Sequence, residues 1–315
     1  MKSGRCFFLN SAPFCILMRH FLIGFLFLLS FNDLYAQDLG ERVKLSLLTG
    51  LQQEHFQWSI AGNMDGQNPN VYSELKWKAI KSRKIGVSLE LLFFKRFLFL
   101  GNYDHTYIHS GRAYDMDYHG DDRTSVIYAE GFDASTGNAY SWKTGIGYDL
   151  VKKTKFSLKP FLGFGISHQL YSVLDYSGKF GLLNSSYNAV WKGPFIKINS
   201  SAGLIRNVNL VSGVAYSQVN FNGKGNWNLI EAFKHPVSFR QGARGYGIEA
   251  SSGLLIFLTR KIGFNIGADY FRWVTGTGVD ELYLATGESD KTRFNEATRE
   301  GLSLHIGVFS GFSLK

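Results

Sequence analysis

The chain of 315 residues contains 34 lysines and arginines against 25 aspartates and glutamates, and its formal net charge is +9. It has 35 glycines, only 5 prolines and 16% aromatic residues, a mixture that argues against disorder and is typical of strands with one apolar face. Both cysteines, Cys6 and Cys15, lie near the start, so the rest of the chain cannot form a disulfide, a thiolate zinc site or a cysteine nucleophile.

The first residues predict a secretory signal peptide. Basic residues precede an apolar run at 21–31, and the small residue Ala36 stands before Gln37, which is the order of regions in such signals. The apolar run is shorter than the roughly 20 residues that a membrane-spanning helix needs. We therefore expect residues 1–36 to be removed near Ala36 and residues 37–315 to form a single domain.

From about residue 42 onwards, apolar and polar residues alternate with the period of two that is typical of strands. Near the end, for example, Leu302 and Leu304 alternate with Ser303 and His305. The alternation predicts ten strands, at 42–60, 71–92, 97–114, 139–151, 155–174, 187–205, 208–222, 239–258, 261–275 and 299–315.

The connections between these strands alternate in length. Tight turns are predicted near 93–96, 152–155, 206–208 and 259–261, and long polar loops at 61–70, 115–138, 175–186, 223–238 and 276–298. This alternation, together with a secretory signal, is typical of bacterial outer-membrane barrels, in which closure pairs every backbone group at bilayer depth.

The predicted fold class is therefore all-β: a transmembrane up-and-down antiparallel β-barrel of about 10 strands, with five long extracellular loops, in the bacterial outer membrane. The alternative is a soluble periplasmic sandwich or lipocalin-like barrel, whose shorter strands would recur about every 8 to 12 residues. The lumen of ten strands is narrow enough to be filled by side chains. Aromatic residues near the strand ends are expected to form interfacial girdles, namely Trp58, Tyr72, Trp77, Tyr140, Trp142, Trp191 and Trp273.

The stretch AYDMDYHGDD at 113–122 carries the most distinctive chemistry in the chain. It superficially matches the start of an EF-hand calcium loop, but the twelfth position, which requires Glu, is Val126, and His119 occupies a position that requires an oxygen ligand. The histidine has no second histidine at ligand spacing, so the signal for a transition metal is weak. We expect no metal and no cofactor.

Asp115 and Asp117 are two residues apart, so they would share one face if the strand continues through them. Two close carboxylates raise the pKa of one of them and can hold a proton or orient a water. The alternative is a hydrated acidic loop. In either case an acidic patch on a basic protein suits a cationic peptide or protein ligand.

The stretch Tyr72–Lys78, the turn near Phe94 and the stretch Gly111–Asp117 resemble the omptins, which are outer-membrane proteases with ten-stranded barrels. The resemblance implies an active site in an extracellular groove, where an aspartate pair faces an Asp–His pair and together they activate a water. Asp115 and Asp117 match the first pair. It also implies lipopolysaccharide as a structural lipid.

The second pair is not matched. Glu231 and Phe233 stand where the resemblance places Asp and His, and His235 lies two residues further, which is roughly 7 Å along a strand. Glu231 and His235 are therefore only substitutes for the missing pair, and the general base is absent from its expected position. Tyr118 and the block Phe233–Phe239 resemble a related group, the Protochlamydia outer membrane protein type, which shares the barrel and is associated with porin-like activity.

The expected function is that of a non-proteolytic or weakly active surface protein, which binds a ligand or acts as a porin. The alternatives are an omptin-type endopeptidase that cleaves at basic residues and an adhesin. Outer-membrane lipid or lipopolysaccharide is the expected partner, although the lipid-binding Tyr, Glu and Arg of omptins correspond here to Ile166, His168 and Leu170. No nucleic-acid partner is expected.

Overall fold

The computed structural model describes residues 42–312 of the chain, so the predicted signal peptide lies outside the described residues. These residues form twelve strands and one short 3-10 helix, η1 (Asp121–Arg123). The strands are β1 (Val43–Ile60), β2 (Ser73–Phe94), β3 (Phe97–Gly120), β4 (Thr124–Asp133), β5 (Gly137–Tyr148), β6 (Val151–Lys152), β7 (Phe156–Leu174), β8 (Asn184–Ile205), β9 (Val208–Asn226), β10 (Phe239–Phe257), β11 (Ile262–Tyr283) and β12 (Ser289–Phe312).

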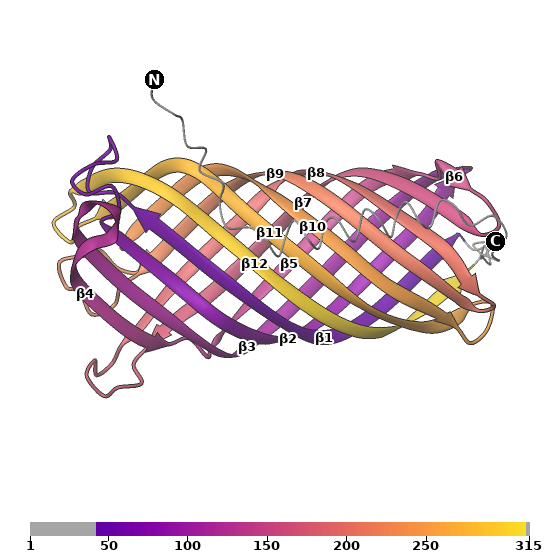
Figure 1. Cartoon of the computed structure of the whole chain (residues 1–315), viewed down its shortest axis with the longest axis horizontal. Coiled ribbons are helices and arrows are strands. Elements are labelled where there is room, and N and C mark those ends of the chain that lie inside the picture. The colour runs from indigo at the N-terminus through magenta and orange to yellow at the C-terminus, as the bar shows by residue number, and fades with distance from the viewer. Residues whose placement is uncertain (1–41, 313–315) are drawn as a thin grey trace, which may run out of the picture.

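The strands form one closed antiparallel ring (Figure 1), because β12 pairs with β1 along nearly its whole length. β4 and β5 share one place in the ring: β5 pairs with the first half of β3 and β4 pairs with its last third. β6 has only two residues and pairs with β7. The ring therefore has ten positions, which confirms the predicted up-and-down barrel of about ten strands.

The prediction of long loops is wrong for two segments, whose residues lie mostly in strands. Residues 115–138 are mostly the end of β3 and the whole of β4, and residues 276–298 are mostly the end of β11 and the beginning of β12. Both hairpins extend beyond the part of the barrel with an apolar outer face. Because polar side chains cover both faces of a strand in water, the alternation of apolar and polar residues is lost there although the strands continue.

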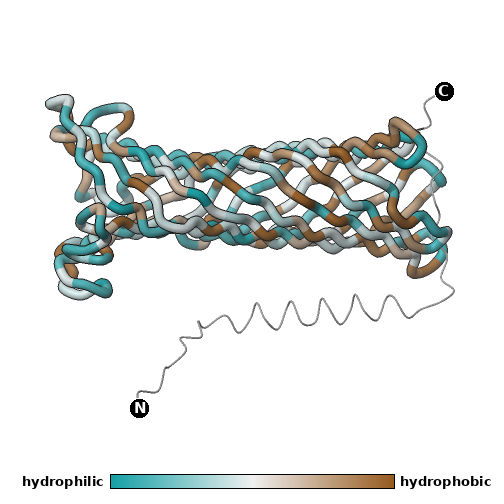
Figure 2. The backbone as a smooth tube through the Cα atoms, turned by 90° about the horizontal axis from the view of Figure 1, so that it is seen from above, coloured by the Kyte–Doolittle hydropathy of each residue, from teal (hydrophilic) through white to brown (hydrophobic). Residues whose placement is uncertain are grey.

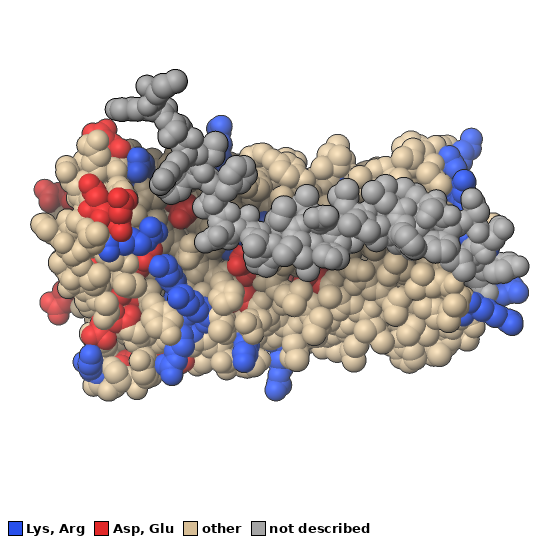
Figure 3. Space-filling model, in the orientation of Figure 1, with Lys and Arg blue, Asp and Glu red and all other residues tan. Residues whose placement is uncertain are grey.

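The outer surface of the barrel carries an apolar band next to the end with the short turns (Figure 2). Exposed aliphatic side chains such as Leu47, Leu51 and Leu304 form it. Exposed tyrosines stand where the band ends towards the long loops, namely Tyr107, Tyr140, Tyr216 and Tyr246. Beyond the band, charged side chains gather around the end that carries β4 (Figure 3). The band is the part suited to the bilayer, and the charged end forms an extracellular rim.

Among residues 42–312, no helix is long and apolar enough to cross a membrane.

Four of the predicted girdle tryptophans instead point into the lumen. Trp58, Trp77, Trp191 and Trp273 are at most 4% exposed, so the girdle prediction is wrong for them. Their positions in the alternation explain the difference: Trp58, for example, shares its face of β1 with the buried Glu54 and Phe56. Tyr140 is exposed, as a girdle residue should be.

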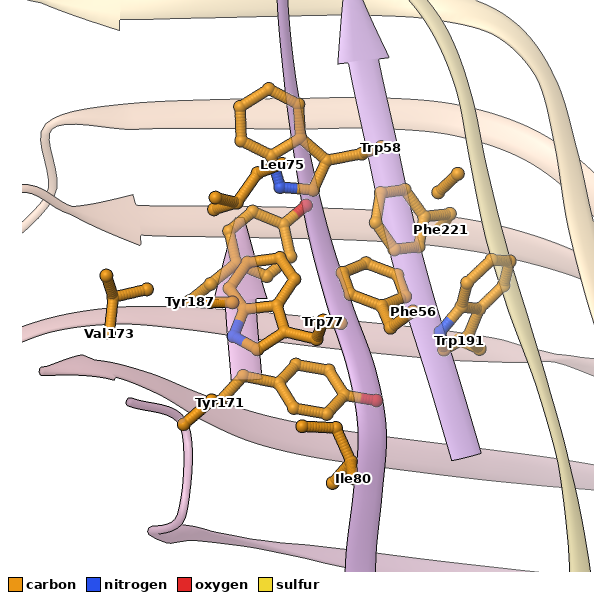
Figure 4. Close-up of a cluster of buried hydrophobic side chains, with 14 of the residues drawn as sticks. Phe56, Trp58, Leu75, Trp77, Ile80, Tyr171, Val173, Tyr187, Trp191 and Phe221 are labelled. Atoms are coloured by element: carbon orange, nitrogen blue, oxygen red, sulfur yellow. The ribbon is translucent and has the colours of Figure 1, made fainter. Parts of the chain in front are cut away.

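These tryptophans belong to a cluster of rings that fills the lumen near the rim (Figure 4). We call it the aromatic plug. Phe56 lies at its centre, with ring centroids 5.1 Å from Tyr171 and 5.4 Å from Trp77. Its members come from eight strands, so the plug spans the ring: Phe56, Trp58, Trp77, Tyr171, Tyr187, Trp191, Phe221, Phe239, Trp273 and Phe294. At this level the prediction of a filled lumen is confirmed.

A buried ion pair adjoins the plug on the side of the short turns. Arg299 of β12 donates from Nη2 to Oε2 of Glu54 on β1 at 2.6 Å, and Tyr171 of β7 donates its hydroxyl to Oε1 at 2.6 Å. Gln52 donates to Oε2 at 2.7 Å, and Glu54 and Arg299 are only 2% and 6% exposed. The network therefore ties β7 to two strands that are not its neighbours in the ring.

Removing the charge of Glu54 should destabilise the barrel strongly, because it leaves Arg299 buried without its counter-ion. We expect Glu54→Gln to lower the free energy of unfolding by about 3–5 kcal/mol, measured by urea titration of protein folded in lipid. The control is Glu300→Gln, which breaks the exposed pair with Arg272 (46% and 40% exposed) and should cost less than about 1 kcal/mol. Equal effects of the two changes would contradict a structural role for the buried pair.

Candidate functional site

The extracellular rim places Asp115 and Asp117 on the inner face of β3. Asp115 lies opposite Leu75 of β2 and Glu130 of β4, and Asp117 lies opposite Ser73 and Tyr128. Directly opposed residues share a face of the sheet, and Leu75 is fully buried among the side chains of the lumen. Both carboxylates therefore face into the rim next to the plug, and we call them the acidic pair.

Both members of the acidic pair lie in the rim, eight and ten residues beyond Tyr107, which stands where the apolar band ends. Both have a raised pKa and so hold a proton more tightly than an ordinary aspartate. Burial, followed by repulsion from Asp117, raises the pKa of Asp115 to about 8, although the backbone N–H of Met116 partly offsets this. Burial also raises the pKa of Asp117, against a hydrogen bond from Ser73. Burial and the charge of Asp115 raise the pKa of the nearby Tyr128 to about 12. At neutral pH the pair therefore carries less than two negative charges.

The substitutes for the second catalytic pair lie in the loop at 227–238, between β9 and β10. Glu231 is exposed, and Phe233 forms an isolated bridge with Leu284. Both ring nitrogens of His235 are engaged close by, Nδ1 with Oδ1 of Asn226 at 2.9 Å and Nε2 with the carbonyl of Ile230 at 3.2 Å. The loop thus holds this imidazole through its own neighbours.

Across residues 42–312, no hydrogen bond or ion pair joins Asp115 or Asp117 to a histidine. His119, the histidine nearest in sequence, is exposed at the tip of β3. The structure thus brings together Asp115 and Asp117 with Tyr128 and Glu130, but it gives the pair no contact with His235. Glu130 in turn forms an ion pair with Lys179 at 3.0 Å, from the loop after β7.

Glu74 is a buried acid that the sequence analysis missed. It lies on the outer face of β2, is 2% exposed, and accepts hydrogen bonds from the hydroxyl of Tyr118 at 2.6 Å, from Nε of Arg123 at 2.8 Å and from Lys76. Burial alone would raise the pKa of Glu74, but these donors outweigh it and lower the pKa. Because Arg123 belongs to η1, Glu74 anchors the tip of the hairpin that carries the acidic pair.

Asp280 is a second acid missed by sequence reading, because its strand was predicted as a loop. It is 5% exposed on β11 and accepts a hydrogen bond from Nε2 of Gln241 at 2.9 Å. Gln241 in turn accepts from the hydroxyl of Tyr187, a member of the plug. Burial raises the pKa of Asp280 to about 7. The upper barrel thus holds a further protonatable carboxyl that is coupled to the plug.

Within the described range 42–312, no group of three or more His, Cys, Asp and Glu residues is arranged to hold a metal ion. On β4, Tyr128 lies opposite Asp117 and Glu130 lies opposite Asp115. The carboxylate of Glu130 is already paired with Lys179. The chemistry open to the rim is therefore proton exchange and the binding of a positive charge.

A family model described as Protochlamydia outer membrane protein matches residues 46–312. The chain belongs to this family. The match covers almost the whole barrel, and it confirms the resemblance predicted from sequence. The protein is therefore an outer-membrane protein, while the predicted cleavage near Ala36 lies outside the described residues.

One solved structure shares the fold of this chain. The outer membrane protease OmpT from Escherichia coli superposes with a TM-score of 0.71 at 11% sequence identity, covering 90% of this chain and 99% of that one. At this identity the likeness shows the fold alone, which is an omptin-like barrel. The translocator domain of the autotransporter NalP from Neisseria meningitidis reaches a TM-score of 0.38 at 11% identity, over 96% of this chain and 98% of that one. None of the curated proteins compared with the chain matches it.

The raised pKa of Asp115 predicts that the barrel loses stability as the pH rises. The folded state keeps a proton on Asp115 up to about pH 8, whereas the unfolded chain releases it near pH 4, so the free energy of unfolding should fall between these values. Asp115→Asn should flatten this decline in urea titrations at a series of pH values. Asp290→Asn, at an exposed position, should leave it unchanged. A decline that is identical in wild type and Asp115→Asn would contradict the assignment.

Proposed function

We propose that this protein binds a cationic ligand at the bacterial surface through the acidic pair of its extracellular rim, without hydrolysing peptides. The observation that carries the proposal is the environment of Asp115 and Asp117: both face inward, are partly buried and have a raised pKa. A basic side chain such as lysine or arginine is the group that best fits this position.

A cation entering the rim would act on a carboxyl that is mostly protonated at neutral pH. A positive charge within about 4–6 Å favours the ionised form and lowers the pKa, so binding should release a proton. The low dielectric of the buried position strengthens this attraction relative to an exposed pair. Affinity should therefore rise with pH over the range in which Asp115 ionises.

The position of His235 is the reason to propose binding without hydrolysis. A general base must come within about 2.6–3.2 Å of the proton that it removes, directly or through one water. His235 instead bonds Asn226 and the carbonyl of Ile230, so both hydrogen bonds would have to break before it could serve the acidic pair. Among the contacts of residues 42–312, the Asp–His arrangement implied by the omptin resemblance thus has no counterpart.

Titration with a dibasic fluorogenic peptide tests the proposal. We expect wild-type protein folded with lipopolysaccharide to bind the peptide without cleaving it, and to bind more tightly at pH 9 than at pH 6. Asp115→Asn combined with Asp117→Asn should weaken binding about tenfold or more, as the loss of buried charge pairing implies. Fluorescence anisotropy measures binding, and dequenching of the peptide measures cleavage.

The control for this titration is Asp290→Asn, which should bind as wild type does. Cleavage that disappears in the Asp115 and Asp117 variants would instead establish an endopeptidase. Binding that persists unchanged in those variants would favour an adhesin that uses other parts of the rim. Either result would overturn the proposed function.

A porin-like activity is the second candidate, because a polar cavity of about 460 Å³ lies in the lumen. The aromatic plug argues against steady passage, since its rings span the lumen between this cavity and the rim. We expect wild-type protein to carry no steady current in planar bilayers. Replacing the central rings with Phe56→Ala and Trp77→Ala should open a measurable conductance, whereas Tyr216→Ala on the outer face should not. A steady wild-type current would favour the porin.

A further inference from the structure

The polar cavity runs through the lower half of the lumen, from the plug to the end with the short turns. Trp273 and Arg299 line it beside the plug, and Arg42 and Lys153 line it at the other end. In an outer-membrane barrel the short turns face the periplasm, so this end of the cavity lies on the periplasmic side. Its volume of about 460 Å³ lies in the range of small-molecule sites, about 300–1,000 Å³. We call it the chamber.

Four lysines and two glutamates from six strands line the chamber and interact across it. Lys159 forms an ion pair with Glu90, and Lys143 forms one with Glu249. Lys44 and Lys197 act electrostatically on Glu90 as well, and Lys197 also acts on Glu249. We call these residues the lysine cluster: Lys44, Lys143, Lys159 and Lys197 with Glu90 and Glu249. Four positive charges against two negative charges leave a surplus of two.

A second charged group in the chamber is paired internally. Lys84 contacts Asp104 at 3.3 Å and Asp269 at 3.4 Å, and Asp269 also accepts from Ser303 at 3.0 Å and lies 3.2 Å from Nδ1 of His305. This group has one negative charge in excess when the histidine is neutral. Counting both groups, the lysines still outnumber the carboxylates by five to four, and Arg42 at the periplasmic end adds to the surplus.

Lys44 and Lys197 are the lysines in this cluster that make no contact with a carboxylate among residues 42–312. Lys44 lies over the ring of Phe309 at 4.9 Å from its centroid. Lys197 is repelled by Lys143 and attracted only at longer range by Glu249, Asp269 and Asp104. Charges inside a protein are usually paired because desolvation is costly. Two lysines that both act on Glu90 and have no contacting carboxylate therefore leave room for an external negative group.

Hydrogen-bonding side chains lie beside Lys197 in the wall of the chamber. A side chain at Gly213 would come within 2.7 Å of Oγ of Ser251 and 2.8 Å of Oδ1 of Asn199, and 3.5 Å of Cε of Lys197. The absence of a side chain at this position thus lets a lysine, a hydroxyl and an amide converge on one part of the chamber wall. Lysine with hydroxyl and amide donors is a donor set suited to phosphate or carboxylate oxygens.

We propose that the chamber binds a small dianion from the periplasmic side, held by Lys44 and Lys197 beside the ion pairs of Glu90 and Glu249. The ligand class is a phosphate monoester or a dicarboxylate, whose two charges match the surplus of the lysine cluster. This site is separate from the acidic pair, because the aromatic plug lies between them. It prefers the opposite sign of charge, so the two ends of the barrel take different ligands.

Calorimetric titration of the folded protein with inorganic phosphate and, separately, with succinate tests this inference at low ionic strength. We expect saturable binding of one dianion per barrel for at least one of the two probes, weakened about tenfold or more in Lys197→Gln and in Lys44→Gln. The matched control is Lys192→Gln, an exposed lysine of the same strand as Lys197, which should bind as wild type does.

The two probes distinguish the source of the dianion. Binding of phosphate alone indicates phosphate monoesters, and binding of succinate alone indicates dicarboxylates. If neither probe binds, or if binding survives unchanged in both lysine variants, the inference is overturned. Heat-dependent migration on gels verifies that each variant is folded. The variant Asp115→Asn with Asp117→Asn should retain dianion binding, which separates a failure here from a failure of the proposed surface function.

Discussion

Every backbone N–H and C=O group at bilayer depth must find a partner within the protein, and this constraint governs the rest of the structure. The pairing of β12 with β1 satisfies it by closing the ring. Once the ring is closed, alternate side chains of every strand point inward, whatever their chemistry. Ten strands enclose a lumen that is too narrow for a wide channel, so the inward side chains must pack together or be solvated within it.

The inward side chains divide the lumen into a closely packed region and an open one. Near the rim, large rings such as Phe56, Trp77 and Tyr171 fill the cross-section. Towards the periplasm, smaller residues and lysines leave the chamber open. The buried pair of Glu54 and Arg299 lies at the boundary, where its hydrogen bond from Tyr171 connects the charged part of the lumen to the plug.

The division separates two groups of charged side chains of opposite net sign. The acidic pair lies on the rim side of the plug, where burial keeps a proton on Asp115. The lysine cluster lies on the other side, where positive charge is in excess. Glu74 has a supporting part, because its bonds to Tyr118 and Arg123 hold the tip of the hairpin on which the acidic pair sits.

The barrel could be predicted from the sequence, because period-two alternation and alternating turn lengths are local features that do not depend on knowledge of contacts. It also predicted that Asp115 and Asp117 would share a face if the strand continued through them, and β3 does continue through both. Tertiary structure alone decided what the inward residues do together. Trp58 and Trp191 could belong to a girdle or to a lumen until the register of every strand was known, since a shift of one residue reverses the face. The partners of Arg299, Lys197 and His235 lie on other strands or depend on the fold of a loop, and such contacts leave no local pattern in the chain.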